Sequence, residues 1–199
     1  LHSVRLKFQE GQYLKEFIKL NSLTNIADWE YFGKGYFGIQ DESTGFPCVL
    51  LDPQPDQRVL DLCAAPGGKS GMLAAMMKNT GELVTVDKFE RRLDILNKNL
   101  ERLKVTNFKS IISDALEFED EEGFDRILID APCSGLGTLT KKPDIKWSKD
   151  TGDIRKLNQV QLALINKAGS LLRKGGYLVY STCTIEPDEN FEIVNKFLN

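Results

Sequence analysis

The stretch VLDLCAAPGGKSG at residues 59–71 constrains the fold of this chain more than any other part of its sequence. An apolar segment precedes Cys63, a loop of small residues and a proline follows, and Lys69 begins a segment with apolar residues at helical spacing. The pattern predicts a strand, a tight loop and a helix, which direct backbone N–H groups and a helix N-terminus toward one ligand. We expect the two alanines and two glycines of the loop to let this ligand approach the backbone closely. The stretch therefore predicts a site for a nucleotide-like molecule.

After the proline-rich entry at residues 53–55, segments of strand and helix character alternate, which is typical of a parallel sheet with crossover helices. We expect an α/β fold for residues 53–199, with a doubly wound, mostly parallel, Rossmann-like sheet. The expected strands are Arg58–Cys63, Glu82–Asp87, Lys109–Asp114, Phe124–Asp130 and Tyr177–Cys183, and the expected helices are Lys69–Lys78, Lys88–Leu103, Asp153–Arg173 and Pro187–Leu198.

Residues 1–52 differ from this pattern and form an expected N-terminal extension that packs on the core. We expect a helix at Gln12–Leu20, where apolar residues share one side, a strand at Tyr36–Gln40 and a short helix near Thr44–Leu51. Such an extension is more often a structural lid than a part of the chemistry. The other interpretation is that it is what remains of an RNA-facing subdomain.

Composition excludes several function classes. The chain has four cysteines without a C-x-x-C pair and a single histidine, His2, so we expect no zinc site, no other metal and no disulfide framework. The same histidine count argues against a Ser–His or Cys–His nucleophile. The sequence has no apolar run of about 18 residues and no signal peptide, so we expect a cytoplasmic protein that does not bind membranes. A net charge of −3 argues against strong nonspecific nucleic-acid binding by this chain alone.

Acidic residues follow or end three of the expected strands, at Asp87, Asp114 and Asp130. The carboxyl ends of parallel strands share one edge of the sheet, so these side chains are expected to face the same crevice as the loop. Asp87 lies about 20 residues after the loop, the spacing at which an acidic side chain accepts hydrogen bonds from ribose hydroxyls. A single strand-end acid is more often a structural brace, but three together favour a ligand site.

Three classes of nucleotide ligand compete for this site. A dinucleotide enzyme prefers G-x-G-x-x-G, which the loop lacks. A P-loop NTPase is suggested by Gly68-Lys69-Ser70, but Cys63 stands where that motif needs its first glycine, and Pro66 interrupts the loop. An adenosine cofactor without phosphates, such as S-adenosylmethionine, fits better because it needs a loop of small residues and acidic ribose contacts.

Two cysteines are expected at the ligand edge, Cys133 in the sequence Asp130-Ala131-Pro132-Cys133 and Cys183 after Ser181-Thr182. One strand-end cysteine is usually a small core residue, but two on neighbouring strands indicate chemistry. The connection over residues 131–152 is long enough to be functional or mobile. Its segment 141–149 carries four lysines and Trp147, which indicates an RNA-facing edge; the alternative is a solvated loop with Trp147 packed inward.

With these motifs, the sequence resembles the RsmB/Nop2/Sun family of RNA cytosine-C5 methyltransferases over residues 36–199. The segment after the Pro-Cys loop is most similar to the bacterial enzymes that act on 16S rRNA. The motifs that carry the resemblance are GIQDES (38–43), LDLCAAPGGKS (60–70), VDKFERRL (86–93), SD (113–114), DAPCSGLG (130–137), KKPDIKW (141–147) and YSTCTIEPDEN (180–190).

The resemblance implies a role for each site residue. Cys183 would be the nucleophile, Cys133 would assist product release, and Asp130 would lie between the cofactor and the target base. Lys69 would lower a thiol pKa or fix the loop, or would be an ordinary solvated charge. The residues implied in cofactor binding are Cys63, Ala64, Ala65, Pro66, Gly67, Gly68 and Lys69 around the methionine and sugar, Asp87 at the ribose with Arg92 nearby, Asp114 at the adenine, and Asp130.

The implied function is methyl transfer from S-adenosylmethionine to carbon 5 of an RNA cytosine, in 16S rRNA or alternatively in tRNA or another rRNA, by a monomer. More distant alternatives are a P-loop NTPase and a non-catalytic RNA-binding relative. Cores of this type carry two further strands after the last helix expected here, and the chain begins with Leu1. We therefore expect a C-terminally incomplete methyltransferase core that is part of a larger protein.

Overall fold

The computed structural model describes residues 8–20, 25–148 and 151–199, so His2 and Lys149 lie outside the described residues. Its main sheet contains five parallel strands in the order β5-β4-β3-β6-β7, which confirms the expected α/β fold. The chain builds the sheet outward in one direction from β3 to β5 and in the other direction from β6 to β7, so the strand order reverses between β3 and β6. Open sheets of this kind bind ligands at such a point, beyond the carboxyl ends of the strands. The strands are β3 (Arg58–Asp61), β4 (Glu82–Asp87), β5 (Phe108–Ile112), β6 (Phe124–Asp130) and β7 (Leu172–Ser181).

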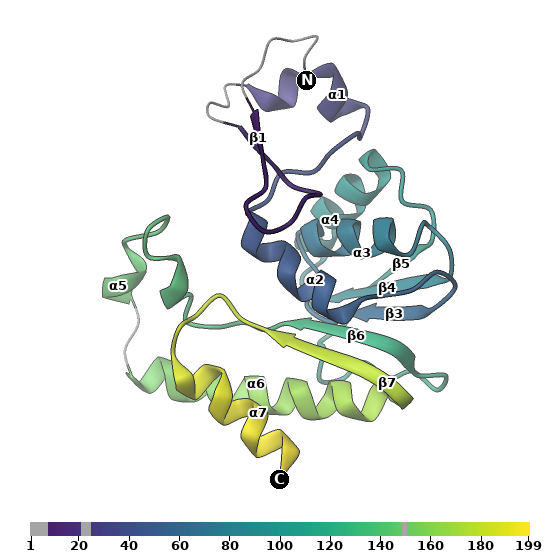
Figure 1. Ribbon diagram of the computed structural model, residues 1–199. Helices are drawn as coiled ribbons and strands as arrows, with labels where there is room; N and C mark the ends of the chain where they lie inside the picture. Colours follow the sequence, from purple (N-terminus) through teal and green to yellow (C-terminus); the bar gives the residue numbers. More distant parts are fainter. Residues whose placement is uncertain (1–7, 21–24, 149–150) are drawn as a thin grey trace.

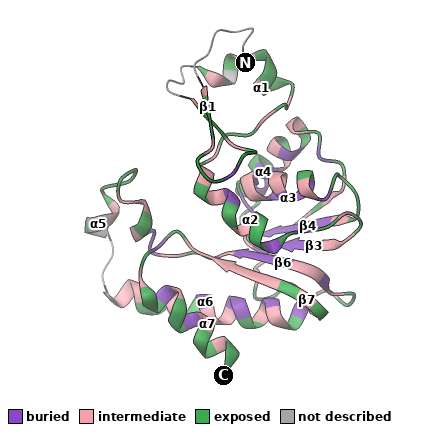
Figure 2. Cartoon of the chain, in the orientation of Figure 1, coloured by how far each residue is buried: buried purple, intermediate pink, exposed green. Residues whose placement is uncertain are grey.

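Helices cover both faces of this sheet (Figure 1). Successive strand residues point to opposite faces, so Val59 and Leu128 pack on one side while Leu60 and Ile127 pack on the other. Both faces are apolar, and the buried residues concentrate in β3, β4 and β6 (Figure 2). One face carries α2 (Phe46–Leu51), α3 (Gly68–Met76) and α4 (Glu90–Arg102), and the other carries α6 (Thr151–Leu171) and α7 (Phe191–Leu198).

The helix expected at Gln12–Leu20 is wrong. Strands β1 (Phe8–Glu10) and β2 (Ile18–Leu20) pair as an antiparallel hairpin instead. The carboxylate of Glu42 accepts hydrogen bonds from the backbone N–H groups of Gln12, Tyr13 and Leu14 at 3.1, 2.7 and 2.7 Å. Glu42 is about 30 residues away in sequence, and it binds backbone donors of the turn that joins the two strands. Tyr13 and Ile18, expected on the apolar side of a helix, remain exposed.

The strand expected at Tyr36–Gln40 is also wrong, because this segment has no strand partner among the described residues. Arg102 holds the chain here by donating hydrogen bonds to the carbonyl oxygens of Phe32 and Phe37. The short helix expected near Thr44–Leu51 is confirmed. The remaining short elements are the 3-10 turns η2 (Ile26–Asp28), η3 (Glu42–Gly45), η4 (Leu136–Thr138) and η5 (Pro187–Glu189), and the helices α1 (Glu30–Gly33) and α5 (Ile145–Ser148).

Two boundaries near the C-terminus differ from expectation. The last strand begins at Leu172 rather than Tyr177, because an irregularity in its pairing with β6 accommodates the extra residues and Gly175 adopts a φ of +83°. The helix expected at Pro187–Leu198 is divided at Asn190, whose φ of −121° and ψ of −91° separate η5 from α7. Within residues 8–20, 25–148 and 151–199, none of the helices is both long enough and apolar enough to span a membrane.

Arg58, the first residue of β3, forms ion pairs at the end of the sheet that lies opposite the carboxyl ends of the strands. Its guanidinium, 15% exposed, donates to Glu82 at 2.6 Å and to both oxygens of Asp120 at 2.6 and 2.8 Å. It also lies 4.4 Å from the centre of the Phe124 ring.

We expect Arg58→Ala to lower the free energy of unfolding by about 3 kcal/mol, because it leaves the partly buried Asp120 carboxylate without its cation. Urea unfolding measures this loss, with the exposed Arg91→Ala as the control that changes stability by less than about 0.5 kcal/mol. Equal stabilities of the two variants would contradict the assignment.

Candidate active site

Two thiols meet at the carboxyl edge of the sheet. Cys133 follows β6 and Cys183 follows β7, and these neighbouring strands are in register with Asp130 opposite Ser181. The Sγ atoms of Cys133 and Cys183 lie 3.2 Å apart, and the backbone N–H of Cys183 donates to Sγ of Cys133 at 3.3 Å. Parallel pairing thus brings together two cysteines that are 50 residues apart.

The two thiols differ in acidity. The hydrogen bond from Cys133 lowers the pKa of Cys183 to about 7, and Lys69 also favours the thiolate, while burial and the charge of Asp130 oppose it. Donating that hydrogen bond, together with burial, raises the pKa of Cys133 above its usual value. This difference favours Cys183 as the thiolate of the pair and Cys133 as the donor.

We expect iodoacetamide to alkylate Cys183 with a midpoint near pH 7. Burial raises the pKa of Cys48 and of Cys63 to about 12, so both should remain unmodified at about pH 8. Peptide mass spectrometry distinguishes the four cysteines. The variant Cys133→Ala should move the Cys183 midpoint toward 9; faster labelling of Cys63 than of Cys183 would contradict the assignment.

Beside the thiols lies an ion pair between the first turn of α3 and the end of β6. Nζ of Lys69 is 2.6 Å from Oδ2 of Asp130, and Oδ1 of Asp130 accepts a hydrogen bond from Oγ of Ser181 at 2.9 Å. The Lys69 side chain is 15% exposed and that of Asp130 is 38% exposed. Lys69 is thus a partly buried, partnered cation, which differs from a solvated charge.

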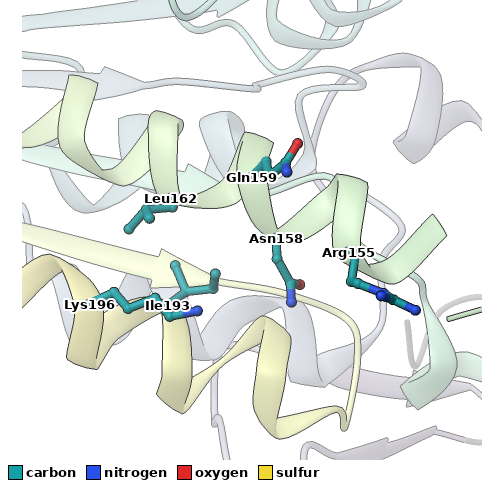
Figure 3. A pocket seen from close by; sticks show the side chains of 6 residues that line it. All are labelled: Arg155, Asn158, Gln159, Leu162, Ile193 and Lys196. Atoms are coloured by element: carbon teal, nitrogen blue, oxygen red, sulfur yellow. The ribbon is translucent and has the colours of Figure 1, made fainter. Parts of the chain in front are cut away.

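Lys69, Asp130 and Cys183 face a pocket of about 430 Å³, within the size range of small-molecule sites. One wall comes from the N-terminal segment, a contribution that sequence reasoning missed. The residues that line the pocket are Ser43, Thr44, Pro47, Lys69, Asp130, Gly137, Thr138, Ser181, Thr182, Cys183 and Thr184. A second groove, between α6 and α7, contains neither thiol (Figure 3).

The loop after β3 packs tightly against the chain itself. Gly67 has a φ of +95°, and a Cβ at this position would lie 2.9 Å from Cγ of Leu96. A Cβ at Gly68 would lie 2.8 Å from Oε1 of Gln40. The two glycines therefore permit close packing of the loop against Leu96 and Gln40.

Acidic side chains follow this loop along the sheet edge. Asp87, 4% exposed, accepts hydrogen bonds from the N–H groups of Ala65 at 3.3 Å and Phe89 at 3.1 Å. Arg92 lies 3.3 Å from Asp87 and donates to the carbonyl oxygen of Ala65 at 2.8 Å. Asp114, two residues beyond the end of β5, pairs with Lys88 at 2.7 Å, which lowers the pKa of Asp114.

The site residues expected from the sequence thus form two groups. Lys69, Asp130, Cys133 and Cys183 cluster at the ends of β3, β6 and β7, while the loop, Asp87, Arg92 and Asp114 extend over β3, β4 and β5. Among the described residues, no group of three or more His, Cys, Asp or Glu side chains could hold a metal ion.

The segment after Cys133 crosses back toward the N-terminal part of the chain. Lys141 forms an ion pair with Asp41, so residues that flank two walls of the pocket are joined. Trp147 is 82% exposed, so the alternative in which Trp147 packs inward is wrong.

Residues 48–199 match the model of a family described as 16S rRNA methyltransferase RsmB/F. The chain is 40% identical over 197 residues to the probable ribosomal RNA small subunit methyltransferase B of Bacillus subtilis, covering 97% of the chain and 44% of that protein. It is 42% identical to the human 28S rRNA (cytosine(4447)-C(5))-methyltransferase, covering 82% of the chain and 21% of that protein.

A solved structure shares the fold. The crystal structure of NSun6 from Pyrococcus horikoshii with SFG superposes with a TM-score of 0.81 at 36% identity, covering 91% of this chain and 46% of that one. The chain therefore spans less than half the length of these three relatives.

Proposed function

The chain belongs to the RsmB/F family of methyltransferases, and on that premise we propose that it transfers a methyl group from S-adenosylmethionine to carbon 5 of a cytosine in RNA. The observation that carries the proposal is that Cys183 shares one pocket with Lys69 and Asp130, while the thiol of Cys133 lies 3.2 Å from its sulfur atom. Within this proposal, residues 53–199 form the catalytic core and residues 1–52 the extension that contributes one wall of the pocket. The protein acts as a monomer in the cytoplasm.

The side chains along the sheet edge fit this cofactor better than a phosphate-bearing nucleotide. Asp87 and Asp114 offer carboxylate oxygens, which accept hydrogen bonds from ribose hydroxyls or an adenine amine and repel phosphate. Nζ of Lys69, which would meet phosphates in a P-loop, is held by Asp130 instead. The loop from Cys63 to Gly68 would hold the methionine and sugar parts. When bound, S-adenosylmethionine supplies an electrophilic methyl group.

Carbon 5 of cytosine is a poor nucleophile, so the target base must first be activated. The Cys183 thiolate adds to carbon 6, and the electron pair of the carbon 5–carbon 6 bond moves toward carbon 5 and N3. Lys69 and Asp130 line the same pocket, so the negative charge that develops on the ring meets an ammonium group, and Asp130 relays a proton from Lys69 to N3.

Release of the product reverses this addition. After methylation, the proton on N3 returns to the pair of Lys69 and Asp130, and the proton on carbon 5 passes to a water molecule. The electron pair left on carbon 5 re-forms the carbon 5–carbon 6 double bond, and the carbon 6–sulfur bond breaks to give the Cys183 thiolate. The Cys133 thiol donates a hydrogen bond to that sulfur, which stabilises the thiolate as it leaves. Cys133 would therefore assist elimination without forming a bond to the base.

The pocket can act only on a base that is outside a helical stack, so we propose a single-stranded or flipped cytosine as substrate. Trp147 and Lys142 are exposed on the segment that borders the pocket and could stack on a base and contact phosphate. The family match and the Bacillus subtilis relative favour 16S rRNA over tRNA or another rRNA.

We expect S-adenosylhomocysteine, but not magnesium ATP, to bind the purified chain in titration calorimetry. Asp87→Ala should weaken this binding about 10- to 100-fold, because a nearly buried carboxylate acceptor is lost. Asp94→Ala, an exposed carboxylate on α4, is the control and should bind as the wild type does. Binding of magnesium ATP without binding of S-adenosylhomocysteine would overturn the proposed function.

Bisulfite mapping of total RNA from a strain that lacks the gene identifies the target. We expect the loss of a single methylated cytosine in 16S rRNA, restored by the intact gene. Loss of a site in tRNA or another rRNA would overturn the proposed target, and an unchanged map would overturn the proposed reaction.

A further inference from the structure

Behind the two thiols lies a buried polar network that the proposed reaction does not use directly. Glu189, in η5, is fully buried, and its carboxylate accepts hydrogen bonds from the backbone N–H of Ser134 at 2.8 Å, from Oγ of Ser134 and from Nε2 of Gln161 at 2.9 Å. Isolated burial of a carboxylate is costly, so three donors to one side chain indicate a built arrangement.

This network holds the chain on both sides of Cys133. Nε2 of Gln161 also donates to the carbonyl oxygen of Pro132 at 2.9 Å, while Glu189 holds Ser134. Gln161 lies on α6 and is fully buried. The residues before and after Cys133 are therefore both fixed, although the Cys133 thiol itself remains partly accessible.

Asn190, the residue after Glu189, holds the chain on both sides of Cys183. Its Oδ1 accepts a hydrogen bond from Oγ1 of Thr182 at 2.7 Å, and its Nδ2 donates to the carbonyl oxygen of Thr184 at 3.2 Å. A further bond from Nδ2 to the carbonyl oxygen of Glu186, at 2.9 Å, fixes the side-chain amide. Thus the residues before and after Cys183 are also both held.

The two halves of the network are joined. Oγ of Ser134 and Oγ1 of Thr184 lie 2.8 Å apart, which links the residue after one thiol to the residue after the other. The hydroxyl of Tyr180 donates to the carbonyl oxygen of Glu189 at 2.9 Å and ties the network to β7. Glu189 and Asn190 adjoin the break between η5 and α7, so this irregularity directs two consecutive side chains to two different loops.

We propose that Glu189 and Asn190 are positioning residues that hold the sulfur atoms of Cys133 and Cys183 at hydrogen-bond distance, so that Cys133 keeps Cys183 in its reactive form. The purpose of this arrangement rests on the proposed function, but the arrangement itself is measurable without RNA or cofactor. The titratable groups around Cys183 are Cys133, Lys69 on α3 and Asp130 at the end of β6, with Glu189 behind the Cys133 loop.

The test is the pH dependence of Cys183 alkylation by iodoacetamide in the variants Glu189→Gln and Asn190→Ala. The amide that Glu189→Gln introduces cannot accept from all three donors, and Asn190→Ala releases Thr182 and Thr184. In both variants, therefore, the bond from Cys133 to Cys183 loosens. We expect the midpoint to rise from near 7 by about one to two pH units.

A rise in the pKa of Cys183 changes the dependence of its alkylation rate on pH in a distinctive way. A higher pKa lowers the thiolate fraction at neutral pH but raises the nucleophilicity of the thiolate, so each variant should react several-fold more slowly than the wild type at about pH 7 and several-fold faster above about pH 9.5. A general loss of structure is recognised separately, because it would also expose the thiols of Cys48 and Cys63 to alkylation.

Matched controls come from the exposed face of α7. Glu192→Gln and Asn195→Ala repeat the two substitutions within a few residues and should leave the midpoint unchanged. If Asn190→Ala does not fold by circular dichroism, Thr184→Val decides. At nearly constant volume it removes the bonds of Oγ1 to Ser134 and to the backbone N–H of Glu186, which belong to the same network.

An unchanged midpoint in the folded variants would overturn the proposal. That outcome would leave the proposed function intact, since methylation and cofactor binding are measured separately. Conversely, if the chain failed to methylate RNA, the midpoint of Cys183 alkylation would still show whether Glu189 and Asn190 position the thiols.

Discussion

Cys183→Ala is expected to abolish methylation, with a loss of about 10⁴-fold or more, and to form no covalent complex with RNA. Cys183 is assigned as the thiolate of the pair because its pKa is lowered while that of Cys133, 3.2 Å away, is raised. Cys133→Ala is expected to behave differently: the adduct still forms, but its release slows about 10- to 100-fold, because the leaving thiolate loses a hydrogen bond to a charged group.

Denaturing electrophoresis with labelled substrate RNA measures both outcomes. We expect a band of retarded RNA with Cys133→Ala and none with Cys183→Ala or with the double variant. Cys48→Ala is the matched control and should behave as the wild type does. The Cys48 thiol is fully buried and does not line the pocket, and its contact with the site is a long bond of 3.7 Å to the carbonyl oxygen of Lys69. An adduct that forms with Cys183→Ala and not with Cys133→Ala would reverse the assignment of the thiols.

The sheet was predictable because its signals are local. The strands beginning at Arg58, Glu82 and Phe124 begin where their apolar patterns predict, and those that end at Asp87 and Asp130 also end as predicted. Since parallel strands share one edge, the meeting of Cys133 and Cys183 followed from their positions after two neighbouring strands.

The parts that were not predictable depend on contacts between distant residues. The helix pattern at residues 12–20 gave way to hydrogen bonds that backbone N–H groups donate to Glu42, which no local rule indicates. In the site, Glu189 and Asn190 had the pattern of a first helical turn, and their bonds to Ser134 and Thr182 become visible only in three dimensions. The wall of the pocket that Ser43 and Thr44 form was not predictable for the same reason.

The second large effect is expected at the ion pair of Lys69 and Asp130. Lys69→Met should lower kcat about 10²- to 10³-fold, because it removes the cation next to the charge that develops on the ring. Asp130→Asn should cause a loss of about 10²- to 10⁴-fold, because an amide cannot carry the proton to N3. Lys98→Met, an exposed lysine on α4, is the control for loss of a positive charge.

The double variant shows whether the two residues act as one unit. Nζ of Lys69 lies 2.6 Å from Oδ2 of Asp130, so each residue fixes the other, and their effects should be strongly non-additive. We expect Lys69→Met/Asp130→Asn to have about the same kcat as the worse single variant, while the Kd for S-adenosylhomocysteine changes less than about three-fold. Strict additivity, or a loss that appears only in cofactor binding, would contradict a joint role in the chemistry. Because Lys69 follows the loop at residues 63–68 and its partner Asp130 lies three residues before Cys133, that distinction decides whether Lys69 serves the proposed methyl donor or the base.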